Sequence, residues 1–207
     1  MFIYIQGAIV AVSLKHTKKQ IRIIESVRRI ISAKGIEKLT IHEIAKDLGV
    51  TDGALYRHFK SKKEIISLLI DDIEKTLLAS IAEAAGKSKE PRQKIRDIFL
   101  SHLSYAEQRK GFTFIIINET LNIRDKSLQK KMFGVIQKYL KVIEEIFRGG
   151  NGSTGFRKGI DASSASIVFF GTVQSIVTLW ALSGYKYPLG KAGLDKILGI
   201  YEKGIAA

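Results

Sequence analysis

The chain has 207 residues, and its 34 Lys and Arg against 20 Asp and Glu give a formal net charge of +14. This length predicts one domain or two small ones with a large buried core, and the 45% share of apolar residues argues against intrinsic disorder. The absence of cysteine excludes disulfide scaffolds, thiolate zinc sites and thiol nucleophiles. The positive charge indicates an anionic partner, such as nucleic acid, a membrane surface or an acidic ligand.

Residues 2–14 form an apolar segment that is shorter than the roughly 20 residues needed to cross a bilayer. No Lys or Arg precedes it, although a signal peptide requires such a basic start. We therefore interpret residues 1–17 as an N-terminal extension, with a membrane or export role of this segment as the alternative. Elsewhere no apolar run reaches the length of a membrane span, so we predict a cytoplasmic protein without stable membrane insertion.

Four helices are predicted between residues 18 and 85, because apolar residues recur there at spacings of three and four. Their predicted ranges are 18–34, 41–48, 51–59 and 62–85. Thr40 is the expected N-cap of the second helix, with Glu43 as its capping-box partner, and Gly49 ends that helix after two turns. Thr51 or Asp52 is expected to cap the third helix.

Five more helices are predicted in the rest of the chain, with ranges 91–110, 112–121, 128–147, 162–183 and 194–205. Residues 112–121 contain three consecutive Ile and would also suit a strand, but no turn and partner strand follow. Residues 149–155 form a glycine-rich loop that lacks the Gly-Lys-Ser/Thr of a phosphate-binding loop. The sequence therefore predicts an all-α fold of about nine helices.

The second and third helices, separated by a tight turn at Gly49, form a helix-turn-helix motif. In this motif the second helix of the pair enters the major groove of DNA. Small residues at Gly53 and Ala54 would let the backbone approach the bases. Tyr56 and His58 can donate to phosphate oxygens, and an arginine such as Arg57 can read guanine or pair with phosphate.

The charge distribution supports DNA as the partner. Residues 1–63 hold 13 Lys and Arg against 5 Asp and Glu, so more than half of the excess lies in less than a third of the chain. Lys62 and Lys63 are placed for phosphate at a helix start, where free amides add to the attraction. We also expect DNA contact from the earlier basic residues, for which a solvated helix face is the alternative. These earlier residues are Lys15, Lys18, Lys19, Arg22, Arg28 and Arg29.

Residues 40–64, TIHEIAKDLGVTDGALYRHFKSKKE, resemble the DNA-binding signature of TetR-family transcriptional regulators. The matching residues are Thr40, Ile44, Ala45, Gly49, Val50, Gly53, Leu55, Tyr56, His58, Phe59, Ser61 and Lys62. The resemblance covers the first four helices. It implies an all-helical homodimer, an N-terminal DNA-binding domain, a C-terminal domain that binds a small effector and dimerises, and repression that the effector releases.

The same resemblance assigns DNA-contacting positions. Thr40, Thr51, Tyr56, His58 and Lys62 match phosphate contacts, whereas Asp52, Gly53, Ala54 and Arg57 match positions that face bases. A carboxylate repels phosphate, so we interpret Asp52 as a helix cap instead. The predicted DNA-contacting set is Thr40, Thr51, Gly53, Ala54, Tyr56, Arg57, His58, Lys62 and Lys63. Leu55 and Phe59 are predicted core residues.

The predicted organisation is an N-terminal extension over residues 1–17, a three-helix DNA-binding domain over residues 18–63, and an effector-binding and dimerisation domain over residues 64–207. A long fourth helix joins the last two. The two helices over residues 162–183 and 194–205 would pair with their copies into a four-helix interface. Two-fold symmetry then predicts an inverted-repeat operator.

Polar and aromatic residues within the apolar C-terminal helices suggest an effector pocket. A buried polar side chain needs a partner, which is either a ligand or a neighbouring residue, and aromatic residues also serve as ordinary core. The predicted effector-binding set is Phe99, His102, Phe114, Asn118, Glu119, Phe170, Gln174 and Thr178. Such a pocket suits an elongated, largely apolar effector such as a lipid, an acyl thioester or a hydrophobic drug.

Other functional classes receive less support from the sequence. The four histidines, His16, His42, His58 and His102, show no metal-binding spacing, and no catalytic combination of acid, base and nucleophile is visible. We therefore predict neither an enzyme nor a cofactor or metal. The alternative function is a nucleic-acid or membrane-surface binding protein without sequence specificity, for which uniform, salt-sensitive binding would be the sign.

Overall fold

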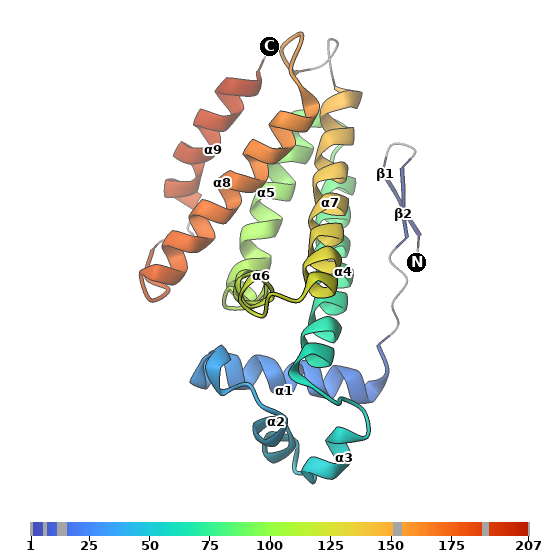
Figure 1. The fold of residues 1–207 in the computed structure, drawn as a ribbon. Coiled ribbons are helices and arrows are strands. Elements are labelled where there is room, and N and C mark those ends of the chain that lie inside the picture. The colour runs from blue at the N-terminus through green and yellow to red at the C-terminus, as the bar shows by residue number, and fades with distance from the viewer. Residues whose placement is uncertain (1, 6–7, 12–15, 151–154, 188–190, 207) are drawn as a thin grey trace. The chain divides into compact units, whose positions relative to one another are not determined.

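The computed structural model describes residues 2–5, 8–11, 16–150, 155–187 and 191–206 (Figure 1). Nearly all of these residues are helical, which confirms the predicted all-α fold. The helices are α1 (Lys18–Lys34), α2 (Ile41–Leu48), α3 (Asp52–Tyr56), α4 (Lys62–Gly86), α5 (Pro91–Gln108), α6 (Phe112–Asn122), α7 (Lys126–Gly149), α8 (Ala162–Leu182) and α9 (Lys191–Ile205), with a short 3₁₀ helix, η1 (Ile36–Lys38), after α1.

Two short strands, β1 (Phe2–Ile5) and β2 (Ala8–Ala11), lie within the segment predicted as an N-terminal extension. They pair antiparallel, with Phe2 opposite Ala11 and Ile5 opposite Ala8. The expectation of a chain without strands is therefore wrong for this segment. Its apolar run is rich in β-branched residues, which favour a strand over a helix.

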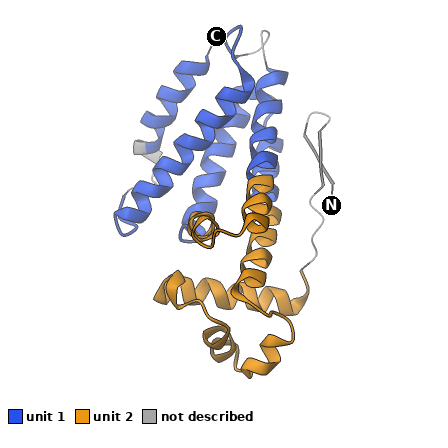
Figure 2. Cartoon of the chain, viewed as in Figure 1, with its two compact units in different colours: residues 1–12, 77–111, 136–207 blue, residues 13–76, 112–135 orange. Residues whose placement is uncertain are grey.

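The chain forms two compact units, which Figure 2 colours separately. Unit 1 comprises Met1–Val12, Leu77–Gly111 and Ile136–Ala207, and unit 2 comprises Ser13–Thr76 and Phe112–Val135. Helices α4 and α7 each contribute to both units. Unit 2 therefore joins the first three helices to α6 and the start of α7, which follow them by more than 50 residues in the sequence.

Caps and buried apolar faces define the first helices of unit 2. Thr17 and Gln20 form a complete capping box on α1, and the Thr40 hydroxyl accepts the Glu43 amide at 3.1 Å on α2. The Thr51 hydroxyl accepts the Ala54 amide at 3.2 Å, so Thr51 rather than Asp52 caps α3. The core side chains of this region are Ile23, Val27, Ile44, Ala45, Leu55, Ile66 and Leu69, all at most 2% exposed.

Helix α6 is attached to the rest of unit 2 by polar and aromatic contacts. Arg28 of α1 forms an ion pair with Asp72 of α4, and its guanidinium lies 5.4 Å from the ring centroid of Phe112 on α6. Phe112 and Ile116 are fully or almost fully buried. These contacts explain why α6 belongs to the same compact unit as α1.

Unit 1 has an aromatic core between α5, α7 and α8. The Phe99 ring meets Phe169 edge-on at a centroid distance of 5.9 Å, and Phe147 packs on Phe156 at 4.7 Å. Phe99, Phe169 and Phe147 are all 0% exposed. The edge-on contact between Phe99 and Phe169 therefore joins α5 to α8.

Helix boundaries differ from the predictions by up to three residues. Helix α3 ends at Tyr56 rather than near residue 59, whereas α7 and α9 begin at Lys126 and Lys191, ahead of the predicted residues 128 and 194. The earlier start of α7 follows from Asp125, whose Oδ1 accepts the amides of Ser127 and Leu128 at 2.9 and 3.0 Å. Most of the predicted glycine-rich loop, residues 151–154, lies outside the described residues.

Candidate nucleic-acid interface and effector region

The turn between α2 and α3 has the geometry of a helix-turn-helix. Gly49 adopts a left-handed conformation, with φ 67° and ψ 35°, which a residue with a side chain would adopt only with strain. The next amide, that of Val50, donates to the Ala45 carbonyl at 3.0 Å and closes the end of α2. Leu55 and Phe59 are 2% and 8% exposed, so α3 is anchored through its inner face, as predicted.

The predicted DNA-contacting residues all lie on unit 2. Side chains or backbone are exposed at Thr40, Thr51, Gly53, Tyr56, Arg57, His58 and Lys63, and are half-buried at Ala54 and Lys62. Tyr56 is 52% exposed although it is aromatic, and beyond the adjoining residues and backbone of α3 no atom lies within 4 Å of the position that a Gly53 Cβ would occupy. The outer face of α3 is therefore open for close approach by a partner.

The start of α1 borders the outer face of α3. The Lys19 ammonium donates a hydrogen bond to Nε2 of His58, and a small cleft is lined by Lys19 and Arg22 together with Val50 and Ala54. Lys19 is thus a basic residue beside α3 that belongs to the same surface. From the sequence, Lys19 was predicted only as one of the basic residues ahead of the helix-turn-helix.

Two other arginines of α1 are engaged within unit 2. Arg28 pairs with Asp72, and Arg29 donates to Asp47 at 2.7 Å. The Arg29 hydrogen bond lowers the pKa of the Asp47 carboxyl. Arg28 and Arg29 therefore join α1 to α4 and to α2. DNA contact by the basic residues of α1 stays a prediction, and Lys15 lies outside the described residues.

Lys62 and Lys63, at the start of α4, hold carboxylates from α6 and from the segment before α7. Lys62 Nζ lies 2.8 Å from Glu119 Oε1, and Lys63 Nζ lies 2.7 Å from Asp125 Oδ2. The hydrogen bond from Lys63 lowers the pKa of Asp125 well below its usual range, with further bonds from Ser127 and Leu128. Both lysines are therefore paired in this structure.

The predicted effector-binding residues fall into two groups. Phe99, His102, Phe170, Gln174 and Thr178 belong to unit 1, and Phe114, Asn118 and Glu119 belong to unit 2. In the first group, His102 Nδ1 hydrogen-bonds with the Tyr139 hydroxyl at 2.9 Å, and the Phe170 ring meets Tyr139 edge-on at 5.6 Å.

The remaining polar members of this set find partners nearby. The Thr178 hydroxyl donates to the Gln174 carbonyl at 2.7 Å, and the Asn118 amide donates to the Phe114 carbonyl at 2.8 Å. Asn118 is exposed. Glu119 pairs with Lys62. The side chains of His102, Asn118, Glu119 and Thr178 therefore have local hydrogen bonds or an ion pair.

His102 and Tyr139 are neutral groups inside the aromatic core of unit 1. Burial lowers the pKa of His102 to about 4 and raises the pKa of Tyr139 well above its ordinary value. The hydrogen bond between Tyr139 and His102 joins α7 to α5. No sequence pattern predicts that these two helices pack together, so this pair could not be found from the sequence.

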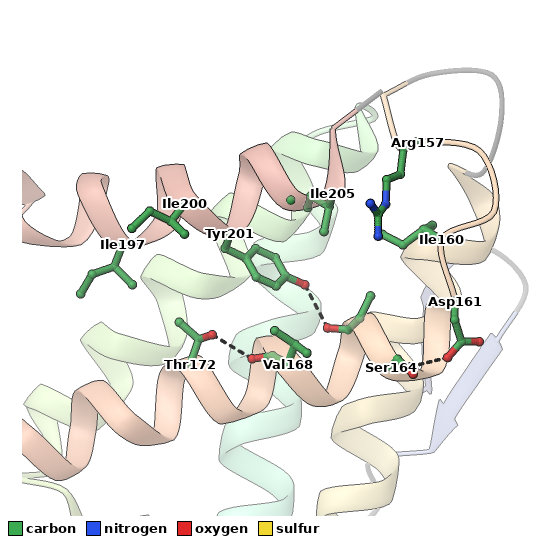
Figure 3. A pocket seen from close by; sticks show the side chains of 12 residues that line it. Arg157, Ile160, Asp161, Ser164, Val168, Thr172, Ile197, Ile200, Tyr201 and Ile205 are labelled. Atoms are coloured by element: carbon green, nitrogen blue, oxygen red, sulfur yellow. Dashed lines mark hydrogen bonds between the residues drawn. The ribbon is translucent and has the colours of Figure 1, made fainter.

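A separate groove of about 510 Å³ lies along α8 and α9 in unit 1 (Figure 3). Val168 of α8 and Ile200 of α9 line it, and they are 56% and 74% exposed. The Tyr201 hydroxyl crosses from α9 to donate to the Ala165 carbonyl at 3.0 Å. None of the predicted effector-binding residues lines this groove, which instead occupies the two helices predicted for dimerisation.

Two models of known protein families match this chain. A profile of bacterial regulatory proteins of the tetR family matches residues 23–69, and a profile of the C-terminal region of YsiA-like proteins matches residues 71–199. The chain belongs to the TetR family. The resemblance seen in residues 40–64 is thereby confirmed.

This TetR-family chain is similar in sequence to two characterised relatives. It is 26% identical over 173 residues to the fatty acid metabolism regulator protein of Bacillus subtilis, an alignment that covers 83% of this chain and 88% of the relative. It is 27% identical over 165 residues to the nucleoid occlusion factor SlmA of Vibrio cholerae, which covers 80% and 84% of the two chains.

Solved structures agree with this placement. FadR from Bacillus subtilis in complex with stearoyl-CoA has a TM-score of 0.73 and 26% identity, over 89% of this chain and 98% of that one. FadR from Bacillus halodurans, with a TM-score of 0.78 and 23% identity over 92% and 98%, supports the fold. This TetR-family protein is a ligand-responsive, DNA-binding transcriptional regulator. Binding to nucleic acid or membranes without specificity is not favoured.

The relatives are regulators, a class that is generally not enzymatic. Within the part of the chain that the structure describes, α8 has the length and composition to cross a membrane, and 39% of its most apolar stretch is buried. Core helices of globular proteins meet the same criterion.

The buried His102 predicts a specific pH dependence of stability. Its pKa is about 4 in the folded protein and about 6.5 when unfolded, so the unfolded chain binds more protons between these values. The free energy of unfolding should then fall as pH drops from 6.5 towards 4, by up to about 1.4 kcal/mol per pH unit from this residue. Urea titrations of the unaltered protein and His102→Gln should show a weaker pH dependence in the variant.

The matched control is His42→Gln, because the His42 side chain is 70% exposed. This control should keep the pH dependence of the unaltered protein. Equal pH dependence in His102→Gln and the unaltered protein would contradict the assignment of a neutral, buried His102.

Proposed function

We propose that this protein represses transcription from an inverted-repeat operator and leaves the DNA when a long-chain acyl thioester binds. The observation that carries the proposal is the match to the stearoyl-CoA complex of FadR across 89% of this chain. Two further observations support it: the outer face of α3 on unit 2 is open, and unit 1 has an aromatic core. A DNA-binding regulator of transcription would act in the cytoplasm.

In the proposed complex with DNA, α3 enters the major groove. Leu55 holds the helix on the core, which directs Tyr56, Arg57 and His58 away from it. Arg57 offers a bidentate donor to guanine, and Tyr56 and His58 offer donors to phosphate. Lys19, hydrogen-bonded to His58, extends the same basic surface along α1.

The proposed dimer interface consists of α8 and α9. Large apolar side chains stay exposed on both helices, which in a monomer would face water. These residues are Ile167, Val168, Leu179, Leu182 and Ile200, each between 49% and 81% exposed. A second copy of this chain would cover them, and a two-fold dimer places two recognition helices on two half-sites of the operator.

The proposed effector combines an apolar chain with an anionic head. The apolar chain suits the aromatic and aliphatic side chains around Phe99 and Phe170, and the head suits a protein with net charge +14. The effector changes DNA affinity only if it binds one conformation better than the other. Helix α4 runs through both compact units and is the element through which such a preference would act.

Selection of bound DNA from a random pool tests the DNA-binding part of the proposal. A preferred inverted repeat should emerge, and Arg57→Ala should lower affinity for it by about 10- to 100-fold and relax the preference at one position. Lys62→Ala should weaken binding to all sequences alike. It should also reduce the slope of log K against log salt concentration by at most about 1. The control Lys130→Ala, on the exposed surface of α7, should change neither. Equal binding of all sequences by the unaltered protein would contradict the proposal.

Light scattering tests the dimer. The unaltered protein should be dimeric at micromolar concentration without DNA, whereas Ile200→Asp should be monomeric because it places a charge in the apolar contact. The matched control is Ile21→Asp, since Ile21 is 43% exposed on α1 and outside the proposed interface. A monomeric unaltered protein rules the interface out.

Melting curves with stearoyl-CoA test the effector. A ligand at 100 times its dissociation constant stabilises a protein by about 2.7 kcal/mol, so the melting temperature should rise clearly. The same ligand should displace the selected DNA. Coenzyme A alone, which lacks the apolar chain, should do neither, and Phe170→Ala should reduce the shift. No shift with stearoyl-CoA counts against an acyl thioester as effector.

A further inference from the structure

Two residues that the DNA would need are held by acidic side chains in this structure. Lys62 and Lys63 open α4 and are the predicted phosphate contacts there. Their ammonium groups lie 2.8 and 2.7 Å from the carboxylates of Glu119 and Asp125. We name Glu119 and Asp125 the acidic pair. All four residues belong to unit 2.

The acidic pair is held in place by its own surroundings. The Glu119 side chain is only 12% exposed, on a helix whose neighbouring turn buries Ile116 completely. Asp125 caps α7 through Oδ1, which accepts the Ser127 and Leu128 amides, and so presents Oδ2 to Lys63. Lys62 and Lys63 are more exposed, at 37% and 49%, so they are more accessible to a partner than the two carboxylates.

We propose that the acidic pair competes with DNA phosphates for Lys62 and Lys63 and so lowers the affinity of the protein for its operator. This inference rests on the proposed DNA-binding function and adds its regulation. A phosphate that approaches Lys62 also approaches the Glu119 carboxylate, and the two anions repel each other. DNA binding therefore requires the lysine to leave its carboxylate or to accept this repulsion.

The location of Glu119 suggests how the competition is controlled. Glu119 lies on α6, one residue after Asn118 and five after Phe114, both members of the predicted effector-binding set. A displacement of α6 would change the distance between Glu119 and Lys62. The same helix could therefore sense a ligand and set how available Lys62 is to phosphate.

Glu119→Gln and Asp125→Asn test the competition, because each keeps the shape of the side chain and Asn still caps a helix. Because both lysines are partly exposed, these ion pairs are worth little, so each variant should bind the selected operator about 2- to 5-fold more tightly at low salt. Salt screens the pair, so the gain should disappear at about 0.5 M salt and the salt dependence should steepen.

A double-mutant cycle separates competition from a general loss of negative charge. In a Lys62→Ala background, Glu119→Gln should give no gain, because its partner is absent. In a Lys63→Ala background, Asp125→Asn should likewise give no gain in DNA affinity. The control Asp71→Asn removes a carboxylate that lies 2.7 Å from Lys131 Nζ and should leave DNA affinity nearly unchanged. Melting temperatures verify that each variant is folded.

The outcomes distinguish this inference from the function on which it rests. Unchanged or weaker DNA binding by both single variants, or a gain that persists without Lys62 and Lys63, overturns the competition alone. Failure of the unaltered protein to select any DNA site overturns the proposed function and the competition with it.

Discussion

The structure depends on how α4 is buried. Ile66, Leu69 and Ile73 are 0% exposed in its first half, and Ile81 is 0% exposed in its second half, so one helix provides core residues to both compact units. Removing this much apolar surface from water is the dominant favourable term in folding. Because packed interiors tolerate little displacement, the position of α4 is constrained by its core residues in each unit.

The second organising feature is the way in which the positive charge is used. Some basic residues, such as Arg28 and Arg29, form ion pairs that join helices within unit 2. Others, such as Arg57, remain exposed on the outer face of the helix-turn-helix. Lys62 and Lys63 fall between these groups, since they are partly exposed and also paired. The net charge alone therefore overstates how many cations a DNA phosphate meets in the free protein.

Local sequence patterns predicted much of the fold and part of the candidate site. Thr40, Thr51 and Gly49 act on residues within four positions of themselves, so their roles as caps and helix stop follow from the sequence. Contacts that span many residues do not follow in this way. The pairing of Glu119 with Lys62 links positions 57 residues apart through the packing of two helices. For this reason Glu119 was predicted in the effector pocket, whereas its ion pair with Lys62 was not predicted.

The sequence by itself determined the helices, the helix-turn-helix and the family, because these depend on spacing, capping and short-range turn chemistry. Only the tertiary structure decided that α6 packs with the first helices, that His102 is buried neutral against Tyr139, and that α8 and α9 leave apolar side chains exposed. The physical reason is that burial and charge pairing are set by which helix faces meet, and a one-dimensional pattern does not encode that choice of neighbours.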